Sequence, residues 1–361
     1  MALSKVNPNL VQNFGRRNLI INGAHTVDQR NGGASATVTN GSDHFIADRF
    51  RFTESSSATF TAQQVSDAPV GFEKSSKVTV TGTDTSLANS EFYRILHPIE
   101  GNNISHLNWG SANAKTLTLS FYVKSSLTGQ FYISAFNAPA NRTFMSGYTI
   151  NAANTWEKKT IAMPGDTSGG WGTGSAAGIY LMWSLGTGSA YQATTLDSWF
   201  AGLGMSKSDQ VNFGATNGAT FQLTGVQLEV GDTATDFEHR SYGEELSLCH
   251  RYFEKFDYAN TQFVDSIGYS NGSSTASCMI NYSTKRAAPT ITLPPAGTSG
   301  GALAFLTGGG GYPSSIGTFT IQLPSTTAAR IYGSSFGGYT IGQASALFAS
   351  GSCSITIDAE L

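Results

Sequence analysis

The sequence predicts an all-β protein, in which a jelly-roll domain is followed by a short helical linker and a smaller β-sandwich. Three observations lead to this prediction. Charged residues make up only 12% of the chain, about half of the ordinary share. The 22 Phe, 14 Tyr and 5 Trp provide apolar area that disordered chains lack. Several segments alternate with a period of two, which is typical of strands with one buried face.

Two segments carry the alternation most clearly, residues 116–123 and residues 179–185. Every second residue in each is apolar and is expected to point inward. The expected inward residues are Leu117, Leu119, Phe121, Val123, Ile179, Leu181, Trp183 and Leu185. A third segment, 221–230, changes parity at Gly225, which predicts a β-bulge there and inward side chains at Val226, Leu228 and Val230.

A chain of 361 residues is longer than one compact core usually spans, so two domains are expected. We expect an N-terminal arm at 1–18, with docking onto a larger particle or simple fraying as its two interpretations. The jelly roll should cover 19–240, a helical linker 241–256 and the C-terminal β-sandwich 257–361. Glu244 and Glu245 stand where a helix N-terminus favours acidic residues.

The second domain is expected to contain strands in three alternating segments, separated by glycine-rich loops. The strand residues expected to alternate are Ala276, Cys278, Ile280 and Tyr282, then Phe319, Ile321 and Leu323, then Cys353, Ile355, Ile357 and Ala359. The loops are expected at Gly308–Gly311 and at Gly333–Gly338. Together these segments are enough for a small sandwich.

Charge and cysteine content exclude several classes of protein. The net charge is −3 and no block of Lys or Arg occurs, which argues against nucleic-acid binding. Cys249, Cys278 and Cys353 lack metal-site spacing and are expected to be small buried residues. Because no signal peptide or membrane helix is predicted, the chain is expected to leave its cell of synthesis by another route or never to leave it. Synthesis in a host cytoplasm and release inside an assembled particle fit both facts.

Three stretches together resemble bacteriophage tail-fibre and virion surface proteins built on a carbohydrate-binding-module-like jelly roll. The segment Asn18-Leu19-Ile20-Ile21-Asn22-Gly23 resembles the first strand of such jelly rolls, and Val226-Gln227-Leu228-Glu229-Val230-Gly231 resembles the last. The segment Glu244-Glu245-Leu246-Ser247-Leu248-Cys249-His250-Arg251-Tyr252-Phe253 is similar to a linker in tail fibres of marine and freshwater phages. His25 departs from the pattern, since an aromatic such as Phe is more usual there.

The resemblance implies a homotrimeric virion appendage that attaches the particle to its host by contacting surface glycans. Its partners would be further copies of itself, other virion or tail proteins and a host glycan, without membrane insertion. The apolar residues Leu246, Tyr252 and Phe256 are the expected oligomer interface. Two alternatives remain open: a purely structural fibre, adaptor or head-decoration protein without a ligand, and a glycan-cleaving tail fibre.

Catalytic chemistry finds little support in the sequence, and we expect no enzymatic activity. Glycoside cleavage needs two carboxylates across a cleft, and no pair is singled out by its surroundings. The stretch Gly165-Asp166-Thr167-Ser168 superficially resembles a serine-esterase block but lacks a recognisable base, so a turn after a strand is expected. The six histidines are isolated in the sequence and are expected at the surface or in hydrogen bonds.

A structural Ca²⁺ between the first and last strands is implied by the jelly-roll resemblance. Its candidate ligands are Glu229 and Asp28. The simpler interpretation, which we favour, is that Glu229 faces solvent opposite Val230.

Aromatic side chains are where sugar binding is expected, because the C–H face of a pyranose stacks on an indole or phenol ring. Trp183 and Trp156 are expected in the core. Trp171 lies in a glycine-rich loop, and Trp109 and Tyr191 have similar settings. These three are the candidate carbohydrate-binding residues, with a lid over the core as the alternative role for each.

Overall fold

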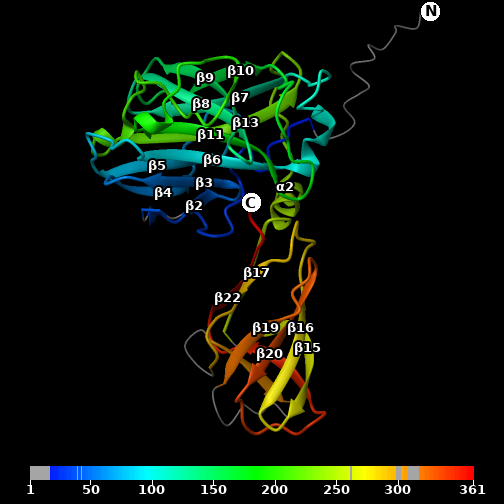
Figure 1. Ribbon diagram of the computed structural model, residues 1–361. Coiled ribbons are helices and arrows are strands. Elements are labelled where there is room, and N and C mark those ends of the chain that lie inside the picture. The colour runs from blue at the N-terminus through cyan, green and yellow to red at the C-terminus, as the bar shows by residue number, and fades with distance from the viewer. Residues whose placement is uncertain (1–16, 39, 42, 261, 298–301, 308–316) are drawn as a thin grey trace, which may run out of the picture. The chain divides into compact units, whose positions relative to one another are not determined.

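The computed structural model describes residues 17–38, 40–41, 43–260, 262–297, 302–307 and 317–361 (Figure 1). The chain forms two compact units, which divide between Leu246 and Ser247, and the second unit runs to Glu360. This division falls inside the predicted linker 241–256. One α-helix, α2 (Tyr242–His250), occurs within the described residues, and none of their helices is long and apolar enough to cross a membrane.

The first unit consists of two antiparallel sheets. The six-stranded sheet has the order β1 (Ala36–Val38), β4 (Thr59–Val65), β5 (Ser75–Gly82), β13 (Thr220–Val230), β7 (Leu117–Ser125) and β10 (Glu157–Met163). The seven-stranded sheet has the order β12 (Trp199–Ala201), β9 (Arg142–Ile150), β8 (Gly129–Asn137), β11 (Ala177–Thr187), β6 (Phe92–Glu100), β3 (Phe50–Ser55) and β2 (Asp43–Ala47). Short 3₁₀ helices are η1 (Gly101–Asn103), η2 (Ser105–Leu107), η3 (Ser189–Tyr191) and η4 (Phe213–Ala215).

The predicted alternation is confirmed in β7 and β11. All eight predicted inward residues of these strands are fully buried in one hydrophobic core, which also contains residues of the other strands of both sheets. Trp183 is therefore a core residue, as predicted. The two sheets pack face to face as a β-sandwich, and this confirms the predicted all-β class.

The predicted bulge in β13 is also confirmed. The pairing of β13 with β7 shifts between Thr224 and Gln227, and Gly225 between them has φ 60°. Val226 and Leu228 then point into the core. Val230, at the end of the strand, is 45% exposed, so its predicted inward position is wrong.

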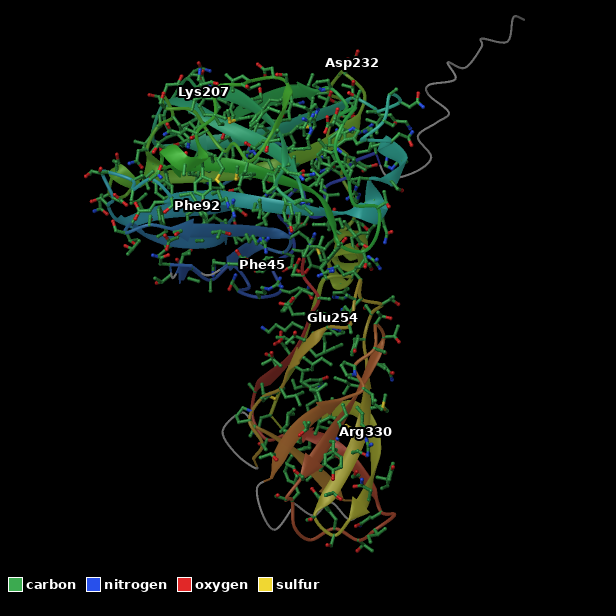
Figure 2. The ribbon with its side chains drawn as sticks, in the orientation of Figure 1. Phe45, Phe92, Lys207, Asp232, Glu254 and Arg330 are labelled. Carbon is green, nitrogen blue, oxygen red and sulfur yellow. The ribbon has the colours of Figure 1, made fainter. Side chains whose placement is uncertain are left out.

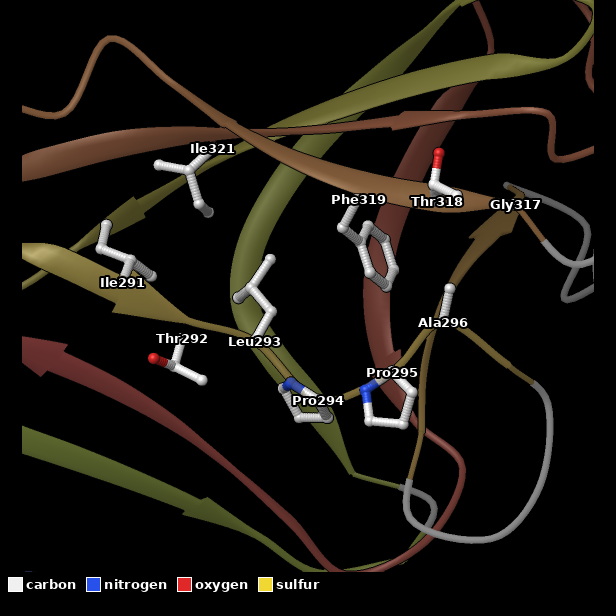
Figure 3. Close-up of a pocket in the computed structure, with 10 residues that line it drawn as sticks. All are labelled: Ile291, Thr292, Leu293, Pro294, Pro295, Ala296, Gly317, Thr318, Phe319 and Ile321. Carbon is white, nitrogen blue, oxygen red and sulfur yellow. The ribbon is translucent and has the colours of Figure 1, made fainter.

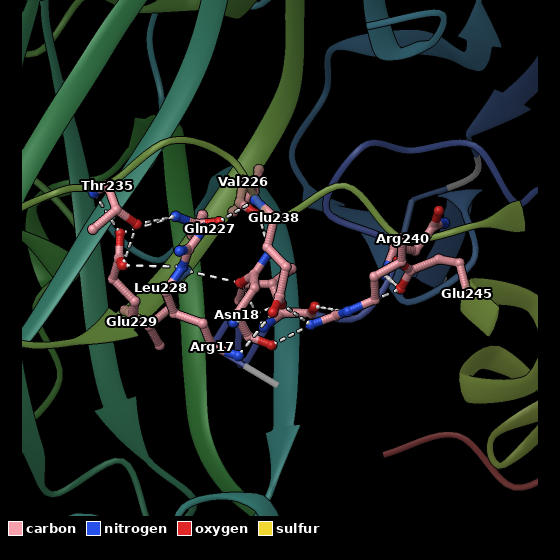
Figure 4. Close-up of polar contacts among 12 residues, drawn as sticks. Arg17, Asn18, Val226, Gln227, Leu228, Glu229, Thr235, Glu238, Arg240 and Glu245 are labelled. Carbon is pink, nitrogen blue, oxygen red and sulfur yellow. Dashed lines mark hydrogen bonds and ion pairs between the residues drawn. The ribbon is translucent and has the colours of Figure 1, made fainter. Parts of the chain in front are cut away.

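The segment that resembles a first strand, residues 18–23, lies beside β13 without forming a regular strand (Figure 4). The backbone N–H of Leu19 donates to the carbonyl oxygen of Leu228 at 2.9 Å. The side chain of Asn18 accepts a hydrogen bond from the Leu228 N–H at 3.0 Å and donates to the Val226 carbonyl at 3.1 Å. Because Asn18 uses its side chain where a strand would use its backbone, the predicted first strand is replaced by an irregular pairing.

Glu229 is buried, with 2% of its surface exposed, so the favoured prediction that it faces solvent is wrong. Its carboxylate accepts hydrogen bonds from the N–H and hydroxyl of Thr235 at 2.9 and 2.6 Å (Figure 4). The side-chain amide of Gln227 donates to it as well, at 2.9 Å. The chain that follows β13 thus folds back over this carboxylate and satisfies it with polar contacts.

The second unit is also a β-sandwich. Its three-stranded sheet has the order β14 (Phe253–Tyr258), β22 (Cys353–Asp358) and β17 (Thr290–Thr292). Its six-stranded sheet has the order β18 (Leu303–Thr307), β21 (Ala344–Ala349), β15 (Phe263–Gly272), β16 (Thr275–Asn281), β20 (Ala328–Ser334) and β19 (Thr318–Gln322). The predicted helix that runs into a strand corresponds to α2 and β14.

The core of the second unit confirms the predicted inward residues of β16 and most of those around β22. Ala276, Cys278, Ile280, Tyr282, Ile355, Ile357 and Ala359 are buried. Cys249 and Cys278 are buried and Cys353 is partly buried, and all three are free thiols. Leu323 is 80% exposed and has φ 50°, so its predicted strand position is wrong, because β19 ends at Gln322. The predicted loop Gly333–Gly338 begins too early, because Gly333 belongs to β20. The predicted loop Gly308–Gly311 lies outside the described residues.

Candidate functional site

The structure brings together two of the three predicted sugar-binding aromatics, Trp109 and Trp171, and adds Trp199 to them. The ring centroids are 4.7 Å apart for Trp109 and Trp171 and 5.1 Å apart for Trp109 and Trp199. Trp171 and Trp199 are 5.2 Å apart, and each pair meets edge to face. We call these three residues the indole cluster.

Three separate elements supply the indole cluster. Trp109 follows η2, Trp171 lies in the connection between β10 and β11, and Trp199 begins β12. The two loops approach so closely that a Cβ on Gly110, which has φ 85°, would lie 2.6 Å from the Gly169 carbonyl oxygen. Only glycine allows both this backbone conformation and this contact.

Asp166, one of the residues predicted in a turn after a strand, holds the Trp171 loop in place. It is 1% exposed and accepts hydrogen bonds from Nε and Nη2 of Arg142 at 2.9 and 2.5 Å. These hydrogen bonds raise the pKa of Arg142 above its usual value. The Trp171 Nε1–H also donates to Asp166, at 3.2 Å. The Asp166 carboxylate therefore has a structural role, in the connection after β10 where the sequence predicted a turn.

The other two indole N–H groups are satisfied in the same way. Trp109 donates to the carbonyl of Lys115 at 2.7 Å and Trp199 to that of Pro164 at 2.6 Å. Because each N–H has a partner within the chain, only the ring surfaces remain for a ligand.

A cavity of about 290 Å³ opens beside the indole cluster. It is lined by Ile104, Ser105, Asn108, Trp109, Ser111, Trp171 and Thr173. Trp109 is 9% exposed and Trp171 is half-buried, so the cavity wall combines indole surface with hydroxyl and amide groups. The side-chain amide of Asn108 makes no hydrogen bond to any described residue. We call this cavity the indole pocket.

The chemistry of the indole pocket suits one sugar ring. An indole surface packs against the C–H face of a pyranose, while amides and hydroxyls bond its hydroxyl groups. The volume is at the lower limit of ligand pockets, about 300 Å³, which leaves room for a single ring. No lining residue is a carboxylate, so the pocket lacks the acid pair that glycoside cleavage needs.

Tyr191, the third predicted aromatic, lies elsewhere. It ends η3 and packs edge to face on Phe92 at 5.6 Å. Phe92 begins β6 (Figure 2). Both rings are half-buried against a small apolar cluster of Leu96, Phe136, Met182 and Met205 on the outer face of the seven-stranded sheet. Tyr191 is thus separate from the indole pocket.

Two further cavities were not predicted from the sequence. One, of about 480 Å³ in the second unit, is lined largely by apolar side chains, with Ile291, Leu293 and Pro295 facing Phe319 and Ile321 (Figure 3). The other, of about 490 Å³ in the first unit, is lined by aromatic and charged residues. Its lining includes Phe72, Phe237, His239, Tyr242, Glu73, Lys74 and Glu245. These residues are scattered between positions 72 and 245, and no local sequence pattern singles them out.

The three residues of the predicted oligomer interface differ in how far they are exposed. Tyr252 is fully buried, and Phe256 is half-buried against the core of the second unit. Tyr252 has no exposed surface in a single copy of the chain, and the oligomer interface stays a prediction. Leu246, which ends the first unit, is half-buried.

The predicted calcium ligands do not form a common site within the described residues. Asp28 accepts hydrogen bonds from the N–H groups of Asn31 and Gly33 at 3.1 and 2.8 Å, and no hydrogen bond or ion pair joins it to Glu229. No group of three His, Cys, Asp or Glu residues in the described part of the chain has metal-site geometry.

Two histidines are buried in the core of the first unit, where the sequence predicted surface or hydrogen-bonded positions. Their rings flank Phe50, at 4.0 Å for His25 and 4.5 Å for His97. Burial lowers the pKa of His25 to about 3 and that of His97 well below its usual value. His25 Nδ1 is hydrogen-bonded to the Ser76 hydroxyl at 2.6 Å, as predicted for a hydrogen-bonded residue, whereas Nδ1 of His97 has no hydrogen-bond partner among the described residues.

No family model matches the chain, and no curated protein does. Solved structures that match part of the chain include the enzymatically active domain of tailspike protein 4 of bacteriophage CBA120. It is 13% identical with a TM-score of 0.30, and the match covers 54% of this chain and 21% of that one. The family 11 carbohydrate-binding module of a Clostridium thermocellum cellulase is 13% identical, with a TM-score of 0.28 and coverage of 56% and 100%. A putative sugar-binding protein of Bacteroides thetaiotaomicron is 14% identical, with a TM-score of 0.28 and coverage of 60% and 100%.

Proposed function

We propose that this chain is a non-catalytic glycan-binding protein that binds a single sugar ring in the indole pocket. The observation that carries the proposal is the wall of that pocket, in which two indoles stand beside the amide of Asn108 and the hydroxyls of Ser105, Ser111 and Thr173. Trp171 and Trp109 would contact the ring, and Asn108 would bond its hydroxyl groups. Asp166 and Arg142 would act as positioning residues.

We further propose that the protein belongs to the surface of a bacteriophage particle and attaches it to a host glycan. The low charge, the abundant aromatics and the resemblance of three stretches to tail fibres support this setting. Because a pocket for one ring binds weakly, attachment would depend on several copies acting together, as in a homotrimer. A monomeric mass in solution under native conditions would contradict the proposed homotrimer.

The test is retention of the purified protein on a panel of bacterial envelope polysaccharides, with each eluate checked for released fragments. The matched pair of variants is Trp171→Ala and Trp156→Ala. Trp156 is also half-buried, but its Nε1–H donates to Asp67 at 3.3 Å, outside the indole cluster. We expect retention by the wild type and Trp156→Ala, loss for Trp171→Ala, and no fragments.

Other outcomes would point to the alternative functions. Retention on no polysaccharide would contradict glycan binding and favour a purely structural fibre. Released fragments would contradict the non-catalytic proposal and favour a glycan-cleaving fibre.

A further inference from the structure

The outer face of the seven-stranded sheet carries an arginine that forms no ion pair with any described carboxylate. Nη1 of Arg94, in β6, lies 3.7 Å from Sδ of Met182 and 3.8 Å from Sδ of Met205. Its Nε has no hydrogen-bond partner within the described part of the chain. Thioether sulfurs are weak acceptors. Asp43 acts on Arg94 electrostatically but pairs directly with Arg51, so no described carboxylate is in ion-pair contact with Arg94.

Other arginines of the same unit contact acidic residues. Arg51 pairs with Asp43 at 2.7 Å. Arg142 pairs with Asp166 at 2.5 Å, and Arg240 with Glu238 at 2.9 Å. The lack of a carboxylate at Arg94 sets it apart from these three arginines.

Burial of Arg94 raises the free-energy cost of holding its charge without an ion-pair partner. Burial, and secondly the nearby charge of Arg51, lower the pKa of Arg94 to about 10. The group remains protonated at neutral pH, so a partly desolvated cation persists there. Opposite it in the register of β11 stands Ser184, whose buried hydroxyl also has no hydrogen-bond partner in the described part of the chain. The Nε–H of Arg94 and the hydroxyl of Ser184, on paired strands, thus both lack a hydrogen-bond partner among the described residues.

Aromatic side chains flank this cation. The guanidinium lies 4.5 Å from the ring centroid of Phe92, which in turn contacts Tyr191. Tyr180 stacks on Phe136 at 5.2 Å. Tyr180 and Tyr191 are both half-buried, and their hydroxyls make no hydrogen bond to the described residues. We call Phe92, Arg94, Tyr180 and Tyr191 the Arg94 surface.

We propose that the Arg94 surface binds the carboxylate of an acidic saccharide. The planar guanidinium pairs with a carboxylate through parallel N–H···O bonds. The aromatic rings contact the C–H groups of the sugar, and the tyrosine hydroxyls bond its hydroxyl groups. This proposal rests on the proposed glycan-binding function of the chain, at a site separate from the indole pocket. Sulfate and phosphate esters share the anionic chemistry.

The test compares oligogalacturonate, whose sugars carry carboxylates, with neutral oligogalactose by calorimetric titration of the full chain. The key variant is Arg94→Gln and the matched control is Arg330→Gln. Arg330 lies in the second unit, where it stacks at 5.4 Å on Tyr332. We expect the wild type and Arg330→Gln to bind oligogalacturonate with an affinity that falls with salt. Arg94→Gln should weaken this binding tenfold or more. Equal binding by Arg94→Gln and the wild type would overturn the proposal.

Thermal unfolding provides a readout that does not depend on the titration. Arg94→Met removes a partly desolvated charge that has no ion-pair contact with a described carboxylate, so the unliganded variant should unfold at the same temperature as the wild type or higher. Oligogalacturonate should raise the unfolding temperature of the wild type alone. A large drop for unliganded Arg94→Met would show a structural role and overturn the proposal.

The outcomes separate this proposal from the proposed function. Loss of acidic-sugar binding in Arg94→Gln, with no effect of Trp171→Ala on any sugar, would support the Arg94 surface and contradict the indole pocket. If the chain bound only neutral sugars and lost them in Trp171→Ala, the result would support the indole pocket and contradict the Arg94 surface. Arg94-dependent binding of a sulfated or phosphorylated saccharide in place of oligogalacturonate would overturn the choice of carboxylate.

Discussion

Asp166 and Arg142 form a bidentate ion pair that fixes the loop carrying Trp171. The Arg142 Nε and Nη2 atoms lie 2.9 and 2.5 Å from the two carboxylate oxygens of Asp166. Asp166 is almost completely buried and comes from the turn after β10, whereas Arg142 begins β9 in the other sheet. Because the carboxylate also accepts the Trp171 N–H, the ion pair links the structure of the sandwich directly to the indole pocket.

Asp166→Asn should therefore destabilise the first unit and weaken sugar binding together. Removing one partner of a buried ion pair costs about 3 kcal/mol, because the remaining charge is left without a partner. Urea unfolding measures this cost. The control is Asp232→Asn, at an exposed position, which should have almost no effect. A stable Asp166→Asn variant with normal sugar binding would refute the positioning role.

Trp109 and Trp171 should differ in their contributions to stability. Trp109 is 9% exposed, so Trp109→Ala should cost about 3–5 kcal/mol in the free energy of unfolding. Trp171 is half-buried, so Trp171→Ala should cost about half as much. Denaturant unfolding of both variants checks this order. The reverse order would mean that Trp171, rather than Trp109, anchors the indole cluster.

The three strands β7, β11 and β13 of the first unit could be predicted because their core residues follow a period of two. The bulge was predictable because a glycine coincides with a change of parity in 221–230. Glu229 and Val230 could not be assigned correctly, since their exposure depends on how the later segment around Thr235 folds back. Burial by a distant or returning segment leaves no trace in local periodicity.

The candidate site was predictable only in part. Glycine-rich surroundings single out Trp171 and Trp109 as loop aromatics. Their contact with Trp199 joins residues up to 90 positions apart, and only the tertiary structure brings them together. Arg94 stands in an ordinary alternating strand, and its lack of a carboxylate partner becomes visible only when all its neighbours are known.

Gly225→Ala should destabilise the bulge in β13. An added Cβ would lie 2.7 Å from the Phe72 ring at a residue with φ 60°, so both steric overlap and backbone strain oppose it. We expect a loss of about 3 kcal/mol. Gly218→Ala is the control, since Gly218 has φ 74° but nothing within 4 Å of the added Cβ. It should lose only about 1 kcal/mol, and equal losses would contradict the packing argument.

The buried histidines should make the first unit sensitive to acid. Their folded-state pKa values are lowered, to about 3 for His25, so the unfolded chain binds more protons below pH 6.5. Stability is therefore complete above about pH 6.5 and falls as the pH drops, by about 1.4 kcal/mol per pH unit for each histidine. In His25→Asn, whose new side chain tolerates the left-handed backbone at φ 54°, the slope between pH 6 and about pH 4 should fall by that amount. Urea unfolding across this range measures the slope, and an unchanged slope would contradict the assignment.

The most direct test of glycan binding at the indole pocket is a titration followed by NMR of the five indole N–H groups. The ligand is an oligosaccharide from whichever polysaccharide retains the protein. The signals of Trp109, Trp171 and Trp199 should shift with ligand concentration, while those of Trp156 and the core residue Trp183 stay in place. Shifts confined to Trp156, or no shift with any retained saccharide, would contradict sugar binding in this pocket.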